Sequence, residues 1–71
     1  MDKVDLKKIK ELRKAKGLTQ ENLAKTLGYR SAIGYHYLES GRCRIKADQI
    51  VVISKELGVE VKALFLSINS A

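Results

Sequence analysis

The sequence predicts an all-α fold, a compact bundle of five short helices. Apolar residues recur at intervals of three and four along the chain, which is the spacing of one face of a helix. No segment alternates apolar and polar residues as a strand does, and the chain contains no proline. Its 71 residues, of which 45% are apolar, suffice for one small core. We therefore expect a single domain over residues 1–71.

The first helix is expected over residues 5–16. Leu6, Ile9 and Leu12 fall on one face, which can pack against the rest of the bundle. The remaining surface carries lysines that stay in solvent: Lys7, Lys8, Lys10, Lys14 and Lys16. Gly17 follows and ends the helix.

The second helix is expected over residues 20–27. Thr19 precedes it and can cap its start, because a threonine hydroxyl accepts a hydrogen bond from an amide of the first turn. Gly28 ends it, since glycine adopts the positive φ of a helix C-terminus without strain. The small side chain of Ala24 lets a following helix cross close by, so this region has the layout of two short helices meeting at a tight turn.

The third helix is expected over residues 32–40, with Ser31 as its N-cap. Gly34 lies inside it, and a glycine there costs about 1 kcal/mol of helix stability relative to alanine. Packing through Tyr35 and Leu38, against leucines of the second helix, must therefore hold this helix in place.

The fourth helix is expected over residues 47–57 and the fifth, a short one, over residues 61–67. Gly58 separates the two. Leu64 and Phe65 of the last helix can close the core. The inward positions of the fourth helix are expected to be Ala47, Ile50, Ile53 and Leu57.

The positive charge of the chain lies in its first two thirds. Residues 1–46 hold 12 Lys or Arg and 5 Asp or Glu, a balance of +7, whereas residues 47–71 hold 2 and 3, a balance of −1. An excess of this kind on one part of a domain is typical of a protein that binds a polyanion. A basic helix face can also serve solubility alone, so charge does not decide the function.

The residues that enzymes and metal sites require are absent from the sequence. There is no nucleophile with a base, no pair of carboxylates at catalytic spacing and no phosphate-binding loop. The only histidine, His36, has no second ligand near it in sequence. The only cysteine, Cys43, can form no internal disulfide and is expected to be a free thiol in a reducing compartment. We expect no catalysis, no cofactor, no metal and no small-molecule substrate.

No stretch of the sequence has the apolar length of a membrane span, and the basic N-terminal region leads into a helical pattern and not into the apolar run of a signal peptide. The expected location is therefore the cytoplasm.

Three stretches, residues 9–28, 35–41 and 53–65, together resemble one known family. They read IKELRKAKGLTQENLAKTLG, YHYLESG and ISKELGVEVKALF. In this order they resemble the phage-repressor-like helix-turn-helix family, also called the XRE family, which includes the lambdoid repressors and the Cro proteins. The resemblance covers nearly the whole chain. It implies a lambda repressor-like DNA-binding domain whose third helix enters the major groove of duplex DNA.

The resemblance also implies roles for individual residues. Gln20, at the start of the second helix, matches a position that contacts a DNA phosphate, with the helix dipole assisting. Arg13 and Glu39 match positions that form an internal ion pair, although Arg13 can also be read as one more basic surface residue. Arg42, Arg44 and Lys46 follow the third helix, where family members often contact phosphates, and Arg30 just ahead of that helix can do the same. The alternative for these cations is a solvated loop.

The interval between Gly28 and Glu39 is one residue longer than the commonest spacing in the family. The start of the third helix is therefore uncertain by one residue. Counted back from Glu39, the positions that face the DNA bases are Ala32, Ile33, His36 and Tyr37, with His36 at the margin. Ala32 and Ile33 can only pack on a thymine methyl group, so hydrogen bonding to bases falls to the other two. Alternatively, the apolar residues support the helix start and the sequence preference is modest or relies on DNA shape.

Several apolar residues of the second half exceed what one small core needs. They are Val51, Val52, Leu66 and Ile68. A homodimer would cover them, and two such modules about 34 Å apart would read successive major grooves. Single exposed valines are also common on monomers and need no partner.

The resemblance and the charge distribution predict a sequence-specific DNA-binding transcriptional regulator, most simply a repressor of phage or mobile-element type that binds operator DNA through the third helix. The expected partner is double-stranded DNA. The alternative is a protein-interaction module on the same scaffold, such as an antitoxin or antirepressor, which docks through Ile33, Tyr35 and Tyr37. A continuous apolar surface on the third helix favours the alternative, and a polar surface flanked by basic residues favours DNA.

Overall fold

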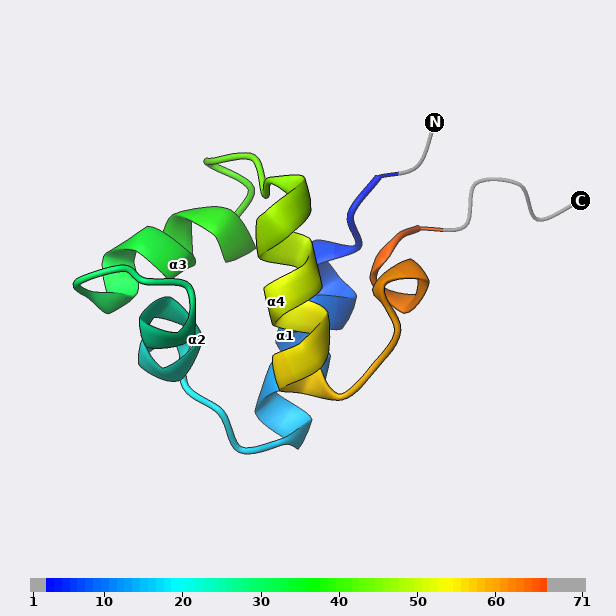
Figure 1. Cartoon of the computed structure of the whole chain (residues 1–71), viewed down its shortest axis with the longest axis horizontal. Helices are drawn as coiled ribbons and strands as arrows, with labels where there is room; N and C mark the ends of the chain where they lie inside the picture. Colours follow the sequence, from blue (N-terminus) through cyan, green and yellow to red (C-terminus); the bar gives the residue numbers. More distant parts are fainter. Residues whose placement is uncertain (1–2, 67–71) are drawn as a thin grey trace, which may run out of the picture.

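The computed structural model of the chain describes residues 3–66. They form four α-helices and one 3₁₀ turn. In chain order these are α1 (Leu6–Ala15), α2 (Gln20–Thr26), α3 (Ala32–Glu39), α4 (Ala47–Leu57) and η1 (Val61–Leu64). Figure 1 shows α2 and α3 together on one side and η1 on the other. The all-α prediction is confirmed.

The prediction of a fifth helix over residues 61–67 is wrong. The helical conformation ends after the single turn Val61–Leu64, and Phe65 has an extended backbone with φ −108° and ψ 145°. The reason lies at the start of the chain, because Phe65 pairs with Val4 in an isolated antiparallel bridge. The amide of Asp5 donates to the carbonyl of Leu64 at 2.7 Å, and the amide of Leu66 donates to the carbonyl of Lys3 at 2.6 Å. These bonds hold the two chain segments side by side (Figure 1).

The first three helices match their expected ranges apart from their terminal residues, which are caps. Asp5 precedes α1, and its carboxylate accepts from the amide of Lys8 at 3.1 Å. Thr19 caps α2, where its hydroxyl accepts from the amide of Asn22 at 3.0 Å and the Asn22 side chain accepts from the amide of Thr19 at 2.8 Å. This reciprocal pair is a capping box, so the start of α2 is well defined.

The core lies between the four helices and η1. Every helix contributes to it, through residues that are at most 4% exposed: Ile9, Leu23, Ala24, Tyr35, Leu38, Ile50, Ile53, Leu57 and Leu64. Ala47, expected to point inward, is exposed instead because it begins α4 at the edge of the bundle. Ser54 is buried in its place on α4, and its hydroxyl donates to the carbonyl of Val51 at 2.7 Å.

No helix within residues 3–66 combines the length and the apolar character needed to cross a bilayer.

Candidate nucleic-acid interface

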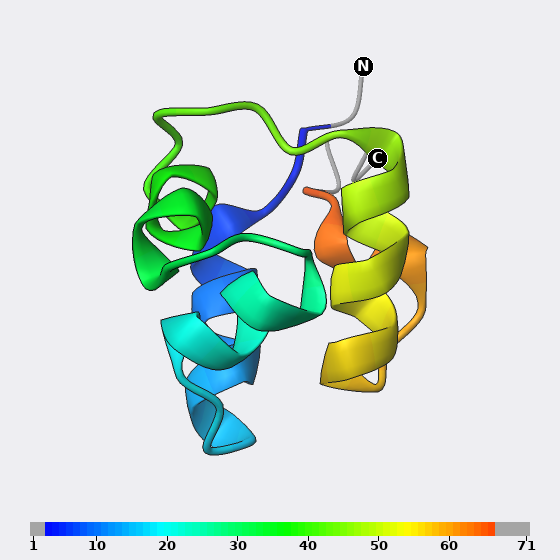
Figure 2. The same cartoon turned by 60° about the vertical axis from the view of Figure 1, so that its left-hand side comes forward.

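Backbone conformation and a backbone hydrogen bond hold the turn between α2 and α3. Gly28 ends α2 with φ +87°, and the amide of Tyr29 then donates to the carbonyl of Ala24 at 2.8 Å. Helix α3 begins at Ala32, the residue expected. Ser31 takes the N-cap position with an extended backbone, but its side chain makes no capping hydrogen bond. The turn directs the chain so that α3 crosses α2 and lies along one side of the molecule (Figure 2).

A buried ion pair joins α1 to the end of α3. The Nε of Arg13 donates to Glu39 Oε2 at 2.8 Å, and the Nη2 of Arg13 donates to Glu39 Oε1 at 3.0 Å. The third nitrogen of the same guanidinium donates to the carbonyl of Leu18 at 2.8 Å. The side chains of Arg13 and Glu39 are only 8% and 3% exposed. Removing either one would therefore leave the charge of the other buried without a counterion. The structure thus brings together the two residues that the family resemblance pairs.

Gln20 joins this network from the start of α2. Its Nε2 donates to Glu39 Oε1 at 3.1 Å, and the side chain is half-buried. The bond orients the amide at the boundary between α2 and α3. Within residues 3–66, this is the only hydrogen bond of the Gln20 amide group, so its second N–H is available to an outside acceptor.

The network perturbs the titration of its members. Burial alone would raise the pKa of the Glu39 carboxyl, but the hydrogen bonds from Arg13 and Gln20, with the nearby Tyr35 hydroxyl, hold it below its ordinary value. The hydrogen bond to Glu39 raises the pKa of Arg13. Burial raises the pKa of Tyr35 well above its ordinary range. The Tyr35 hydroxyl lies close to the pair, yet its geometry toward neighbouring groups is not that of a hydrogen bond.

The outer surface of α3 is mixed in character. Ile33 is 52% exposed and His36 is exposed, whereas Ala32 and Tyr37 are half-buried. Tyr35 is fully buried in the core. The apolar docking surface of Ile33, Tyr35 and Tyr37 suggested for a protein-interaction module is therefore wrong, because its central residue cannot reach a partner.

The loop that follows α3 carries exposed cations. Arg42, Arg44 and Lys46 are exposed there, and Arg30 is exposed just before α3. The guanidinium carbon of Arg42 lies 5.2 Å from the centre of the Tyr37 ring, in a cation–π contact that ties the loop to α3. We call residues 42–46 the basic loop.

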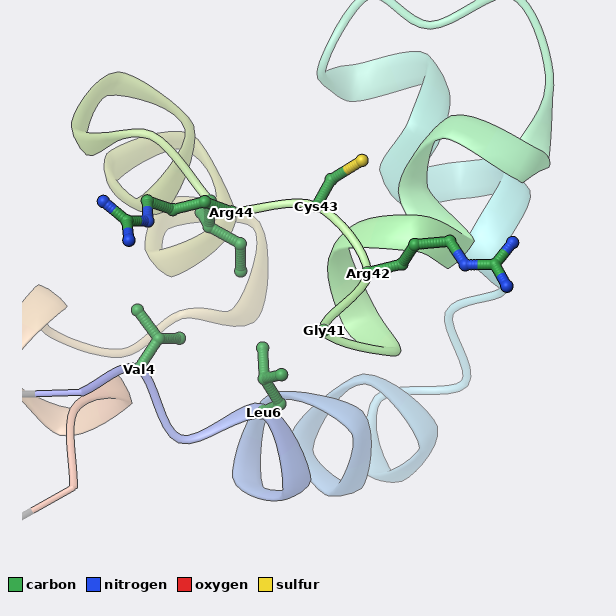
Figure 3. Close-up of a pocket in the computed structure, with 7 residues that line it drawn as sticks. Val4, Leu6, Gly41, Arg42, Cys43 and Arg44 are labelled. Carbon is green, nitrogen blue, oxygen red and sulfur yellow. The ribbon is translucent and has the colours of Figure 1, made fainter.

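The basic loop forms one wall of a shallow groove of about 380 Å³. Val4 and Leu6 lie on the opposite side of this groove (Figure 3). The side chains of Arg42 and Arg44 point in opposite directions along the loop, so the loop spreads its charge over a wide surface (Figure 3). Cys43 is an exposed free thiol and points away from Val4 and Leu6 (Figure 3). In the described part of the chain, no three His, Cys, Asp or Glu side chains gather into a metal site.

The residues expected at a dimer interface differ in their exposure. Val51 and Leu66 are 41% and 42% exposed, and Val52 is half-buried. Ile68 lies outside the described residues.

Sequence reasoning missed Tyr29, which lies in the turn and is half-buried. Its ring rests on Gly34 of α3, and its hydroxyl accepts a hydrogen bond from Gln49 of α4 at 2.8 Å. The only signal in the sequence was Gly34 itself, a glycine within a short helix at a position where the backbone is helical.

The crossing of α2 and α3, the ion pair behind it and the exposed surface in front of it define a helix-turn-helix domain. A family model described as helix-turn-helix matches residues 9–64, well over half of the chain. The chain therefore belongs to this family, the XRE type of helix-turn-helix, whose members are DNA-binding regulators. Comparisons with curated proteins and with solved structures give no significant match.

Proposed function

We propose that the protein is a sequence-specific repressor of phage or mobile-element type, which binds operator DNA by placing α3 in the major groove. One observation carries this proposal: the exposed residues of α3 lie between exposed arginines at both of its ends, Arg30 before it and Arg42 after it. A helix flanked in this way can approach bases while the arginines meet the phosphates on either side. Repression then needs no chemistry, because occupying the operator is sufficient.

The phosphate contacts are assigned to Gln20 and to four exposed cations. The second N–H of Gln20 can donate to a phosphate oxygen while the first holds Glu39. The cations neutralise phosphates and release counterions, which gives affinity and register without sequence information. They are Arg30, Arg42, Arg44 and Lys46.

The base contacts are assigned to the outer surface of α3. Ile33 is the most exposed apolar residue of the helix and can pack on a thymine methyl group. His36 is exposed and can hydrogen-bond to a base edge or a phosphate. Ala32 and Tyr37 are half-buried and reach less far. This set contains no bidentate Arg, Asn or Gln, so we expect a modest sequence preference that DNA shape supplements.

Two copies of the domain are proposed to bind one operator. Val51 and Leu66 are the members of the expected interface whose side chains are exposed, so they are the residues that a second copy would cover. A dimer would place two α3 helices about one turn of DNA apart, and the operator would be a palindrome with half-sites about 34 Å apart.

The test is a titration of the protein against duplex DNA at several salt concentrations, with the preferred duplex first selected from a random pool. We expect affinity to fall steeply with salt and Arg44→Ala to weaken binding to all duplexes alike, with a slope lower by about 0.9 on a log–log plot. Ile33→Ala, which truncates the most exposed apolar side chain of α3, should instead change which sequence is preferred. Lys62→Ala is the control, because it removes an exposed cation from η1, in the half of the chain without excess positive charge.

Absence of binding at low salt, or binding that does not depend on salt, would show that the domain does not act on DNA. A selected duplex with a single half-site would contradict the dimer and leave DNA recognition in place.

A further inference from the structure

The aromatic ring of Tyr29 lies so close to the backbone of Gly34 that no residue with a side chain fits at position 34. A Cβ added to Gly34 would lie 2.5 Å from Cδ1 and 2.7 Å from Cγ of the Tyr29 ring. Ordinary contacts of a Cβ begin near 3.4 Å, so any side chain at this position would force the ring and the helix apart by roughly 1 Å. Gly34 lies inside α3 with a helical backbone, so the contact with Tyr29, and not backbone conformation, accounts for a glycine here.

The hydroxyl of Tyr29 connects this contact to the basic loop. Nε2 of Gln49, in the first turn of α4, donates to the Tyr29 hydroxyl at 2.8 Å. Oε1 of the same Gln49 side chain accepts from the backbone amide of Lys46 at 2.9 Å. A single chain of contacts therefore runs from Gly34 through Tyr29 and Gln49 to Lys46, the last residue of the basic loop.

We propose that Tyr29 and Gly34 form a positioning pair, which fixes how far the first half of α3 stands out from the domain relative to the basic loop. This inference rests on the proposed binding of DNA by α3. Ile33 and Ala32 precede Gly34 by one and two residues, so a displacement at Gly34 moves the side chains that are proposed to meet the bases. The cations of the basic loop stay in place. The base contacts of α3 and the phosphate contacts of the loop can then no longer form at the same time on one duplex.

The energetic balance of α3 supports a functional reason for the pair. Glycine in a helix interior is less favourable than alanine, and α3 has only eight residues over which to offset it. The helix accepts this cost at the one interior position where Tyr29 leaves no room for a methyl group. Gly34 therefore serves the placement of α3 and not its intrinsic stability.

The test is a double-mutant cycle over Gly34→Ala and Tyr29→Ala in the full chain. Each variant is titrated with two probes: the duplex that the unaltered protein selects from a random pool, and a shuffled duplex of the same length and composition. All titrations are made well below the Tm of the least stable variant, so that every variant is folded. The measured quantity is the ratio of the two affinities, because a loss of folded protein lowers both affinities together and leaves their ratio unchanged.

We expect Gly34→Ala alone to lower this ratio several-fold with the affinity for shuffled DNA nearly unchanged. In the Tyr29→Ala background, Gly34→Ala should have no further effect on the ratio, because the obstructing ring is gone. In that background Gly34→Ala should raise the Tm by about 4–8 °C, because alanine has the higher helix propensity. Tyr29→Phe keeps the ring and should retain most of the ratio. Phe65→Ala is the matched control, a half-buried aromatic outside α3 whose loss should lower the Tm and leave the ratio unchanged.

Equal losses of the ratio from Gly34→Ala in both backgrounds, or a ratio that no variant changes, would overturn the positioning role. If the unaltered protein binds neither duplex in a salt-dependent way, the proposed function fails first. In that case the Tm values of the same cycle still show whether the ring and the glycine are coupled.

Discussion

The two ends of α3 are attached to the rest of the domain by different physical means. At its C-terminal end, Glu39 accepts hydrogen bonds from Arg13 and Gln20, so the attachment consists of buried charge. Toward its N-terminal end, Gly34 receives the ring of Tyr29, and the attachment consists of shape and one neutral hydrogen bond. The C-terminal end of α3 therefore fails when a charge is lost, whereas the N-terminal end fails when the fit between the Tyr29 ring and Gly34 is lost.

The largest expected effect is at the charged end. Glu39→Ala leaves the guanidinium of Arg13 buried without its counterion, and we expect the free energy of unfolding to fall by about 3 kcal/mol. Urea denaturation of the variant and the parent measures the difference. Glu11→Ala, which removes an exposed glutamate from α1, is the control and should change the free energy by less than about 0.5 kcal/mol. A similar small change for Glu39→Ala would mean that the ion pair contributes little.

A smaller effect at the same end depends on pH. The folded protein holds the pKa of Glu39 below the ordinary value of 4.5, so the unfolded chain takes up the proton first as the pH falls. The stabilisation is complete above pH 4.5 and is lost as the pH drops through the folded pKa. Glu39→Gln keeps the shape but cannot titrate, so the gap in unfolding free energy between parent and variant should shrink from pH 7 to pH 3. A constant gap would contradict a lowered pKa.

The smallest effect is expected at the neutral end. Tyr29→Phe keeps the ring on Gly34 and removes the acceptor of the Gln49 amide, and we expect a loss of about 1 kcal/mol. Because no charge takes part, the loss should be the same at pH 7 and pH 3. Denaturation curves of this variant beside those of Glu39→Gln would place pH dependence at one end of α3 only. A loss for Tyr29→Phe that varies with pH would remove the distinction.

Much of the fold could be predicted because local signals coincide in this sequence. The capping threonine at Thr19, the glycine at Gly28 and the apolar spacing agree on where α2 begins and ends. The end of the fold was not predictable in this way, since Phe65 is extended only because Val4, far away in sequence, pairs with it. Local propensity carries no information on such a pairing.

The candidate site likewise has one part that could be predicted and one part that could not. Arg13 and Glu39 were paired from a family resemblance, which supplies long-range information that spacing alone does not. The resemblance implies no role for Tyr29 or Gly34, so it could not supply their contact. A glycine at an energetically unfavourable helical position was the remaining clue, and its meaning required the three-dimensional position of the ring.

The bridge between residues 3–5 and 64–66 also determines where this domain can be tethered. The chain enters and leaves the helical bundle at one corner, on the side away from α2 and α3 (Figure 1). The protein can be attached at that corner to a surface, a bead or a second protein module. Such an attachment connects to the bridge and leaves the exposed side chains of α3 unobstructed. The exposed side chains of α3 thus lie away from this attachment point, whereas the basic loop lies beside it, across the groove from Val4.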